Sequence, residues 1–290
     1  MANVYQMVTD RIIEEMQKGI IPWHRPWVCL GSEEQAISYV SRKPYSLLNQ
    51  LLLGRPGEWL TWNQIHALGG SVKKGARSGL VVFYTKLEIE KEAEDGEKEK
   101  KTVPVLKWYR VYHQEDTEGI QSKLEPKTQD TEGKPALEPV YAAETIINDY
   151  LEREPELKFH SDKESGSAYY SPMTDTVVVP MLGQYQIVEE YYSTTFHELT
   201  HSTMKETRCN RRGEDRAAAF GDSNYSREEL VAELGSAMLC NRAGLDSKKA
   251  FRNSVAYIQS WLKALKNDPK MIVWAASRAE TAAKYILNEI

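Results

Sequence analysis

The sequence predicts an α+β fold divided into two domains. The first half alternates short helical patterns with two runs of β-forming residues, and the second half is mostly helical with one short pair of strands. A polar stretch rich in proline, glycine and threonine separates the halves, as is typical of an interdomain connection. We therefore predict one domain over residues 1–125, a linker over 126–139 and a second domain over 140–290.

Apolar residues at helical spacing, followed by glycine, predict the helices of the first domain at 8–19, 46–54 and 61–70. Thr61 is the predicted N-cap of the third helix. Two β-rich runs, 80–89 and 103–113, predict paired strands. The charged stretch 88–102 between them predicts a solvent-exposed hairpin tip.

The second domain is predicted to combine a small sheet with a series of helices. Two short strands are expected within 167–180, around a turn at Pro172–Asp175. Amphipathic patterns predict helices at 142–154, 185–205, 226–244, 254–268 and 269–289. Ser226 is the predicted N-cap of the helix over 226–244, and Gly244 is its C-cap signal.

The composition is that of a soluble globular protein, with 41% hydrophobic and 27% charged residues. No apolar run approaches the roughly 18 residues of a membrane span, and the N-terminus lacks the pattern of a signal peptide. We therefore expect a cytoplasmic protein without a membrane partner. The cysteines, Cys29, Cys209 and Cys240, are widely spaced, which predicts reduced thiols.

The stretch FHELTHST, residues 196–203, contains two histidines at metal-ligand spacing. On a helix, His197 and His201 lie on one face, one turn apart, so both imidazoles can reach one metal ion. Glu198 is rotated by about 100° and can act as a base toward a metal-bound water without being a ligand. This pattern predicts one Zn²⁺ ion with Glu198 as the catalytic residue. The alternative is a surface helix with two solvated histidines.

A catalytic zinc ion usually has three protein ligands and one open position. The next predicted helix, in the stretch EELVAEL, offers Glu229 and Glu233 one turn apart. We predict Glu229 as the third ligand and Glu233 as the carboxylate that orients a histidine ligand. Glu233, Asp246 and Asp222 are the alternative ligands. Glu228 lies one residue off the ligand face and is expected to be solvated.

Two further features are expected beside such a site. An edge strand, formed by either 167–172 or 175–180, would pair with an extended peptide substrate of unknown identity. A donor that stabilises a developing oxyanion is also expected. Its candidates are Tyr169, Tyr170, Tyr225 and Arg211.

The net charge of −5 conceals a basic region over 36–86, where seven basic residues accompany one acid, Glu58. Five of the seven tryptophans lie within the first 108 residues, and aromatic side chains interleaved with cations suit single-stranded nucleic acid. The predicted DNA-binding residues are Lys73, Lys74 and Arg77 of a glycine-rich loop, with Arg42, Lys43, Trp23, Trp27 and Trp62. For each tryptophan, a place in the core is the alternative.

Five segments give a further signal: YQMVTDRIIEEMQKGIIPWHRPW, RKPYSLLNQLLLG, EWLTWNQIHALGGSVKKGARSGLVVFY, YYSTTFHELTHST and YSREELVAELGSAML. In this order they resemble the ArdC-type antirestriction proteins of conjugative elements. The resemblance covers most of the chain, and 88–139 is the least matched part. It implies an N-terminal single-stranded-DNA-binding domain and a C-terminal zincin-like metallopeptidase domain.

The resemblance also implies protection of incoming DNA from host restriction and a metal site at His197, Glu198 and His201. It supports a glutamate of EELVAEL as the third ligand. Two hypotheses follow. The protein is either a DNA-binding zinc metallopeptidase, or a non-proteolytic protective protein whose metal site is structural or vestigial. A metal-free helical interaction module is a third hypothesis.

Overall fold

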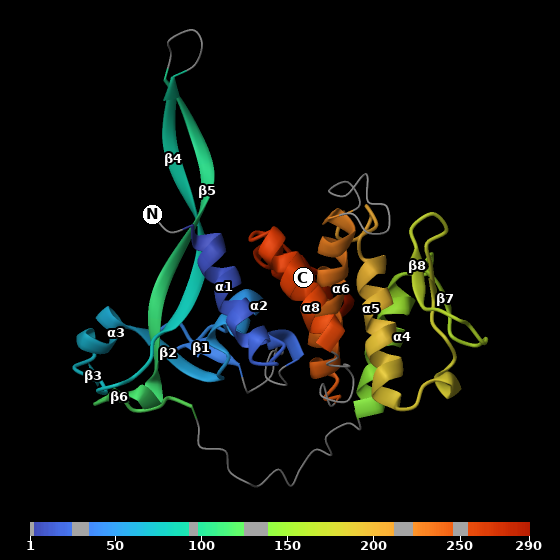
Figure 1. The fold of residues 1–290 in the computed structure, drawn as a ribbon, viewed down its shortest axis with the longest axis horizontal. Helices are drawn as coiled ribbons and strands as arrows, with labels where there is room; N and C mark the ends of the chain where they lie inside the picture. Colours follow the sequence, from blue (N-terminus) through green and yellow to red (C-terminus); the bar gives the residue numbers. More distant parts are fainter. Residues whose placement is uncertain (1–2, 25–34, 93–97, 125–138, 212–222, 246–254) are drawn as a thin grey trace.

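The computed structural model describes residues 3–24, 35–92, 98–124, 139–211, 223–245 and 255–290 (Figure 1). Within these ranges the chain forms helices and sheets, which confirms the predicted α+β class. The first half forms a sheet flanked by helices. The second half is a group of helices, and its own small sheet lies on the side away from the first half (Figure 1). None of the described helices is long and apolar enough to cross a membrane.

The main sheet has the strand order β1-β2-β5-β4. Its strands are β1 (Ala36–Ser38), β2 (Gly57–Thr61), β4 (Gly79–Glu92) and β5 (Lys98–His113). Strand β1 is parallel to β2, and the other neighbours are antiparallel. The β4–β5 hairpin projects far beyond the rest of the molecule (Figure 1). Its strands extend to the pair Glu92↔Lys98. Residues 88–92 and 98–102 of the predicted hairpin tip therefore form paired strands.

Three helices and a two-stranded sheet complete the first half. The helices are α1 (Val4–Gln17), α2 (Leu47–Leu53) and α3 (Trp62–Ala67), and a 3₁₀ turn, η1, covers Pro22–His24. Thr61 caps α3 as predicted, because its hydroxyl accepts the Gln64 N–H while the Gln64 side chain accepts the Thr61 N–H. Strand β3 (Ser71–Val72) pairs with β6 (Thr117–Glu118), and η2 (Gln114–Asp116) precedes β6.

The second half contains the predicted helices and a three-stranded sheet. The helices are α4 (Pro139–Arg153), α5 (Val188–Ser202), α6 (Ser223–Arg242), α8 (Val255–Asn267) and α9 (Met271–Ile286), with a 3₁₀ turn η3 at Leu182–Gln184. The sheet has the order β7-β9-β8, formed by Lys158–His160, Thr176–Val178 and Tyr169–Ser171. Helix α6 begins at Ser223, so the prediction of Ser226 as its N-cap is wrong. Cys209 and Cys240 are free thiols, and Cys29 lies outside the described residues.

The largest hydrophobic core joins the two halves of the chain. Buried residues of α1 and α2 belong to the same cluster as residues of α5, α6, α8 and α9. Trp23 of η1 is fully buried and contacts Trp261 of α8 edge to face, with ring centroids 6.4 Å apart. Two hydrogen bonds add to this contact: Thr9 Oγ1 donates to the Pro269 carbonyl over 2.8 Å, and the Leu47 N–H donates to Glu280 over 2.8 Å. The first helices therefore pack as part of the C-terminal helical body.

Helices α5 and α6 approach each other closely at one glycine. A Cβ atom on Gly235 would lie 2.6 Å from Cγ2 of Thr200, which is too close for any real contact. The same pair of helices is linked by a hydrogen bond of 2.7 Å from Ser236 Oγ to the Ser193 carbonyl. This close packing decides which residues of α6 face α5.

Candidate metal centre

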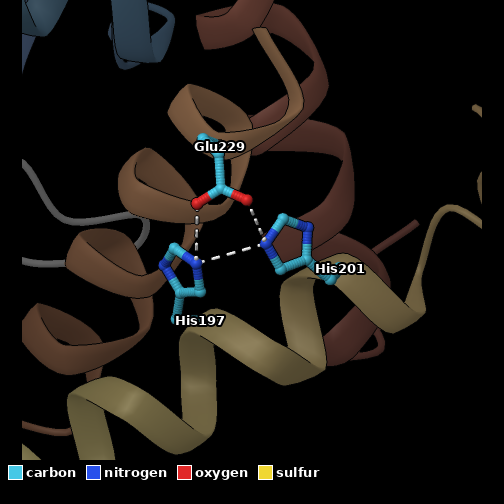
Figure 2. Close-up of side chains that lie close together, drawn as sticks. All are labelled: His197, His201 and Glu229. Carbon is cyan, nitrogen blue, oxygen red and sulfur yellow. Dashed lines mark hydrogen bonds and ion pairs between the residues drawn. The ribbon is translucent and has the colours of Figure 1, made fainter. Parts of the chain in front are cut away.

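Two histidine side chains of α5 share one space beside α6 (Figure 2). The Nε2 atoms of His197 and His201 are 3.2 Å apart, and the rings meet edge to face. Phe196, Leu199 and Thr200, on the other faces of α5, are fully buried. The packing of those residues therefore fixes the direction in which the histidines point. Their side chains remain 20% and 12% exposed, which leaves room for a ligand from solvent.

Glu229 of α6 reaches both imidazoles with its two carboxylate oxygens (Figure 2). Oε2 lies 3.5 Å from His197 Nε2, and Oε1 lies 3.4 Å from His201 Nε2. All three ligand atoms lie within 4.8 Å of one another, and they form the one such group found among the described residues. The structure thus brings together the three residues predicted as metal ligands.

The electrostatics of this cluster favour a bound cation. Burial alone would raise the pKa of the Glu229 carboxyl, but hydrogen bonds and charge interactions with His197 and His201 hold it far below its usual range. Burial disfavours a charged His201, yet its hydrogen bonds to Glu228 and Glu229 raise the pKa of that imidazole to about 10. A pocket that attracts a proton this strongly also attracts a metal ion in its place.

Glu228 is buried and contacts the opposite nitrogen of His201, so the expectation that it is solvated is wrong. Its side chain is 9% exposed, and Oε1 lies 3.5 Å from His201 Nδ1. The same carboxylate accepts hydrogen bonds of 2.8 and 3.2 Å from Arg211. Arg211 in turn donates to Thr203 Oγ1 over 2.7 Å and to the Thr200 carbonyl over 3.0 Å. A charged chain therefore orients His201 from behind.

The orienting carboxylate at His201 is thus Glu228, in the role that the sequence suggested for Glu233. Glu233 is half-buried, one turn further along α6. The sequence signal for Glu228 was weak, because an acid in the first turns of a helix is usually explained by the helix dipole. Only the approach of Arg211 from beyond the end of α5 distinguishes Glu228 from a surface acid. The alternative ligands Asp222 and Asp246 lie outside the described residues.

Glu198 lies beside the cluster without joining it. Its residue is 7% exposed, and burial raises the pKa of its carboxyl above the usual range. The backbone of Tyr170 on β8 donates a hydrogen bond to it. Strand β8 is an edge of the small sheet and packs against α5, so the expected edge strand is the one over 167–172. A carboxylate whose pKa is raised accepts a proton more readily than an ordinary carboxylate does.

Two of the oxyanion candidates are occupied elsewhere. The Tyr170 hydroxyl donates to Asp175 over 2.9 Å, and the Arg211 guanidinium binds Glu228. Tyr169 is 48% exposed on the edge strand β8. The side chain of Tyr225 lies outside the described residues.

The predicted DNA-binding cations lie on the first half of the molecule. Lys73, Lys74 and Arg77 are exposed in the loop between β3 and β4, and Lys73 Nζ donates to the Glu115 carbonyl over 2.8 Å. Arg42 forms an ion pair with the buried Glu58. Lys43 is exposed.

The structure separates the three predicted DNA-binding tryptophans. Trp23 is fully buried in the core, so the prediction that it contacts bases is wrong, because no face of its ring is open to stacking. Trp62 is 50% exposed and contacts the ring of His66, with centroids 4.6 Å apart. Trp27 lies outside the described residues.

Two family models match the chain in sequence order. The model described as the N-terminal domain of anti-restriction factor ArdC matches residues 2–112. The model described as a zincin-like metallopeptidase matches residues 150–278, which include the cluster of His197, His201 and Glu229.

Three curated relatives have the same sequence identity to this chain. It is 29% identical over 98% of its length to the DNA primase TraC of Escherichia coli, of which it covers 20%, and a second such primase is covered to 27%. The chain thus spans about a quarter or less of these primases. It is also 29% identical to the uncharacterized protein y4eC of Sinorhizobium fredii, and here it covers 91% of the relative.

Two solved structures match nearly the whole chain. They are crystal structures of the antirestriction ArdC protein from the R388 plasmid. The metal-free form matches with a TM-score of 0.70 and 30% identity, over 99% of this chain and 97% of the other. The Mn(II)-bound form matches with a TM-score of 0.68 and 31% identity, over 99% and 98%. Full-length similarity at this identity, with both domain models in the same order, shows that the chain belongs to the ArdC antirestriction family.

Proposed function

We propose that this protein binds single-stranded DNA of a conjugative element and carries a zinc metallopeptidase site in its second domain. The observation that carries the peptidase proposal is the convergence of His197, His201 and Glu229, with Glu198 buried beside them. Two histidines and one carboxylate are the ligand set of catalytic zinc sites that keep one position open. The proposed place of action is the cytoplasm, where incoming DNA meets restriction enzymes.

His197, His201 and Glu229 would hold one Zn²⁺ ion. Such an ion supplies a Lewis acid that polarises a bound water or carbonyl oxygen. Glu198 would act as the base that accepts a proton from the attacking water and passes it to the leaving amine, and the raised pKa of its buried carboxyl supports this role. Glu228 and Arg211 keep His201 oriented during this exchange.

The edge strand β8 would hold the substrate. Its outer side has no partner strand in the described sheet, and its Tyr170 contacts Glu198 through the backbone. An extended peptide that pairs with this edge would pass Glu198 and the metal ligands. The substrate is therefore proposed to be a locally unfolded segment of a protein.

A metal of purely structural importance is disfavoured by the solved relative. That ArdC protein has a metal-free and a Mn(II)-bound structure, and this chain matches the two with TM-scores of 0.70 and 0.68. Similar matches to both forms support a fold that does not need the ion.

DNA binding is supported by the exposed basic loop at Lys73, Lys74 and Arg77 and by the ArdC match over residues 2–112. Cations of this kind contact phosphates, so the affinity for labelled single-stranded DNA should fall steeply as the salt concentration rises. An affinity that is independent of salt would contradict this part of the proposal.

The decisive experiment compares the wild type with Glu198→Gln. We expect the variant to retain stoichiometric zinc and to lose hydrolysis of an unfolded protein substrate, because the proton acceptor is removed and the ligands are not. His197→Ala should lose the zinc. If Glu198→Gln protects transferred DNA from restriction as well as the wild type does, protection does not require proteolysis. If it hydrolyses the substrate at the wild-type rate, the peptidase assignment is wrong.

A further inference from the structure

A groove on the main sheet is lined by none of the proposed metal ligands and by none of the basic loop residues Lys73, Lys74 and Arg77. It has a volume of about 460 Å³, within the usual range of small-molecule sites. Its floor is the face of β4 and β5 that carries Val81 and Val111. One wall is the turn that contains Lys43, Pro44 and Tyr45, just before α2.

Three aromatic rings lie in a row along this groove. The ring centroids of Tyr45 and Phe83 are 6.2 Å apart, and those of Phe83 and Tyr109 are 5.9 Å apart. Phe83 and Tyr109 are 45% and 46% exposed although both are large and apolar. Exposed aromatic side chains gathered at one groove are typical of a binding surface.

The charge around these rings is positive. The described residues that line the groove include one charged side chain, that of Lys43, and no acidic side chain. Lys107 lies directly opposite Phe83 in the β4–β5 register and is exposed, so it projects from the same face of the sheet. The groove thus combines flat apolar faces with cations at its border.

The wall of the groove is held in a fixed conformation. Arg42 has a φ of 58°, which is uncommon for a residue other than glycine. Its guanidinium binds the buried Glu58, and the Ser38 N–H donates to the Lys43 carbonyl over 2.9 Å. The turn therefore presents Lys43 and Tyr45 in fixed positions, as a preorganised site requires.

We propose that the groove is a base-stacking site for single-stranded nucleic acid, in which unpaired bases stack on Phe83 and Tyr109 while Lys43 and Lys107 meet the phosphates. The inference rests on the proposed DNA-binding function and assigns it a site. Duplex DNA is excluded from the groove because its bases are already stacked on one another. A peptide of acidic residues would supply carboxylates for the cations but no aromatic rings to stack on Phe83 and Tyr109.

The chain contains matched controls for this site. Tyr84 and Trp108 are the sequence neighbours of Phe83 and Tyr109, are 57% and 40% exposed, and project from the opposite face of the same strands. The test variant is Phe83→Leu/Tyr109→Leu, which keeps apolar bulk but removes the flat rings. The control is Tyr84→Leu/Trp108→Leu. Melting temperatures of both variants close to that of the wild type show that the fold is retained.

The probes are a fluorescein-labelled thymine homopolymer and an abasic strand of equal length, measured by fluorescence anisotropy. We expect the wild type and the control to bind the homopolymer at least about tenfold more tightly than the abasic strand, and the test variant to lose most of that preference. The free energy of stacking one base on an aromatic ring is large enough for two rings to account for a tenfold difference in affinity.

The outcomes distinguish a wrong binding site from a wrong DNA-binding function. If the test variant keeps the wild-type preference for bases, the assignment of the groove as the stacking site is wrong, while the proposed DNA-binding function is unaffected. If it loses affinity for both strands equally, the rings do not stack on bases, and the inference is again wrong. If the wild type binds neither strand, the proposed DNA-binding function fails, and the groove fails with it.

Discussion

At the scale of single residues, adjacent positions on one helix have different roles. Glu229 faces the Nε2 atoms of both histidines, whereas Glu228 contacts Nδ1 of His201 and the buried Arg211. The two carboxylates are about 100° apart around α6, so only one of them can face the open side of the site. The other is behind the ligand, where it fixes the ring orientation.

The carboxylate of Glu228 can be neutralised with little change in size. Glu228→Gln should lower the zinc affinity by about 10- to 100-fold, because the negative charge that holds His201 Nδ1–H is lost while the size of the side chain is kept. The affinity is measured by competition with a chromophoric chelator. Glu233→Gln, one turn along the same helix, is the control for the loss of one negative charge and should have a smaller effect. Equal affinities of Glu228→Gln and the wild type would contradict the role.

Asp175 joins three parts of the second half. It has a φ of 48° in the turn before β9, where it accepts hydrogen bonds from Arg208, Lys205 and the Tyr170 hydroxyl. Burial would raise the pKa of its carboxyl, but these donors lower it to about 2. Because the folded-state pKa lies below the unfolded value, Asp175 stabilises the fold at pH above about 4 and loses this effect as the pH falls toward 2.

Asp175→Asn should therefore lower the free energy of unfolding by about 2 kcal/mol at neutral pH, and by progressively less from pH 4 to pH 2. Asparagine tolerates the left-handed backbone, so the change acts mainly through charge. Urea denaturation across this pH range measures the difference. Glu156→Gln, whose side chain is 83% exposed, is the control and should show little dependence. A constant difference between Asp175→Asn and the wild type would disprove the linkage.

At the scale of elements, the metal centre depends on how closely α5 and α6 pack. Gly235 lies against Thr200, and Ser236 donates to the Ser193 carbonyl, so the two helices have one register and one separation. Glu229 lies six residues before Gly235 on α6, and His201 follows Thr200 directly on α5. The contact at Gly235 therefore sets the position of Glu229, the proposed third metal ligand, relative to the two histidines.

Gly235→Ala should lower the free energy of unfolding by about 1–3 kcal/mol and weaken zinc binding, because the new methyl group forces the helices apart. Thr200→Ala removes the two side-chain atoms nearest to that methyl group. The double variant should therefore recover part of both losses. Thermal denaturation and chelator competition on all four proteins give the coupling between the sites. Strictly additive effects would show that the two residues do not limit the approach of the helices.

At the scale of the whole molecule, the hydrophobic core does not divide at the linker predicted over 126–139. Helices α1 and α2 belong to the sequence of the first domain but share a core with α8 and α9. Ile12 of α1 is fully buried in that core. The half that matches the ArdC N-terminal domain and the zincin-like half are therefore expected to lose their structure together.

Ile12→Ala should lower the free energy of unfolding by about 2–5 kcal/mol, because it leaves a cavity in the shared core. We expect one unfolding transition, followed by circular dichroism, and release of zinc at the same temperature. Glu14→Gln, at an exposed position of the same helix, should leave that temperature almost unchanged. Two separate transitions, with zinc release unaffected by Ile12→Ala, would show that the halves unfold independently.

Local patterns allowed the sequence to determine the elements and the histidine pair. His197 and His201 are one turn apart on any helix, and the capping box at Thr61 and Gln64 is likewise complete within four residues. The charged strands around 88–102 were predicted too short, because their pairing depends on a register between distant residues rather than on hydrophobic alternation.

Contacts between distant segments were decided only by the tertiary structure. Nothing near Glu228 in the sequence distinguishes it from a solvated acid until Arg211 packs against it, and Trp23 resembles the exposed tryptophans until α8 covers its ring. The aromatic groove joins Tyr45, Phe83 and Tyr109 from three separate stretches. Helix periodicity and capping act over a few residues, whereas burial and ion pairing depend on which surfaces meet when the chain folds.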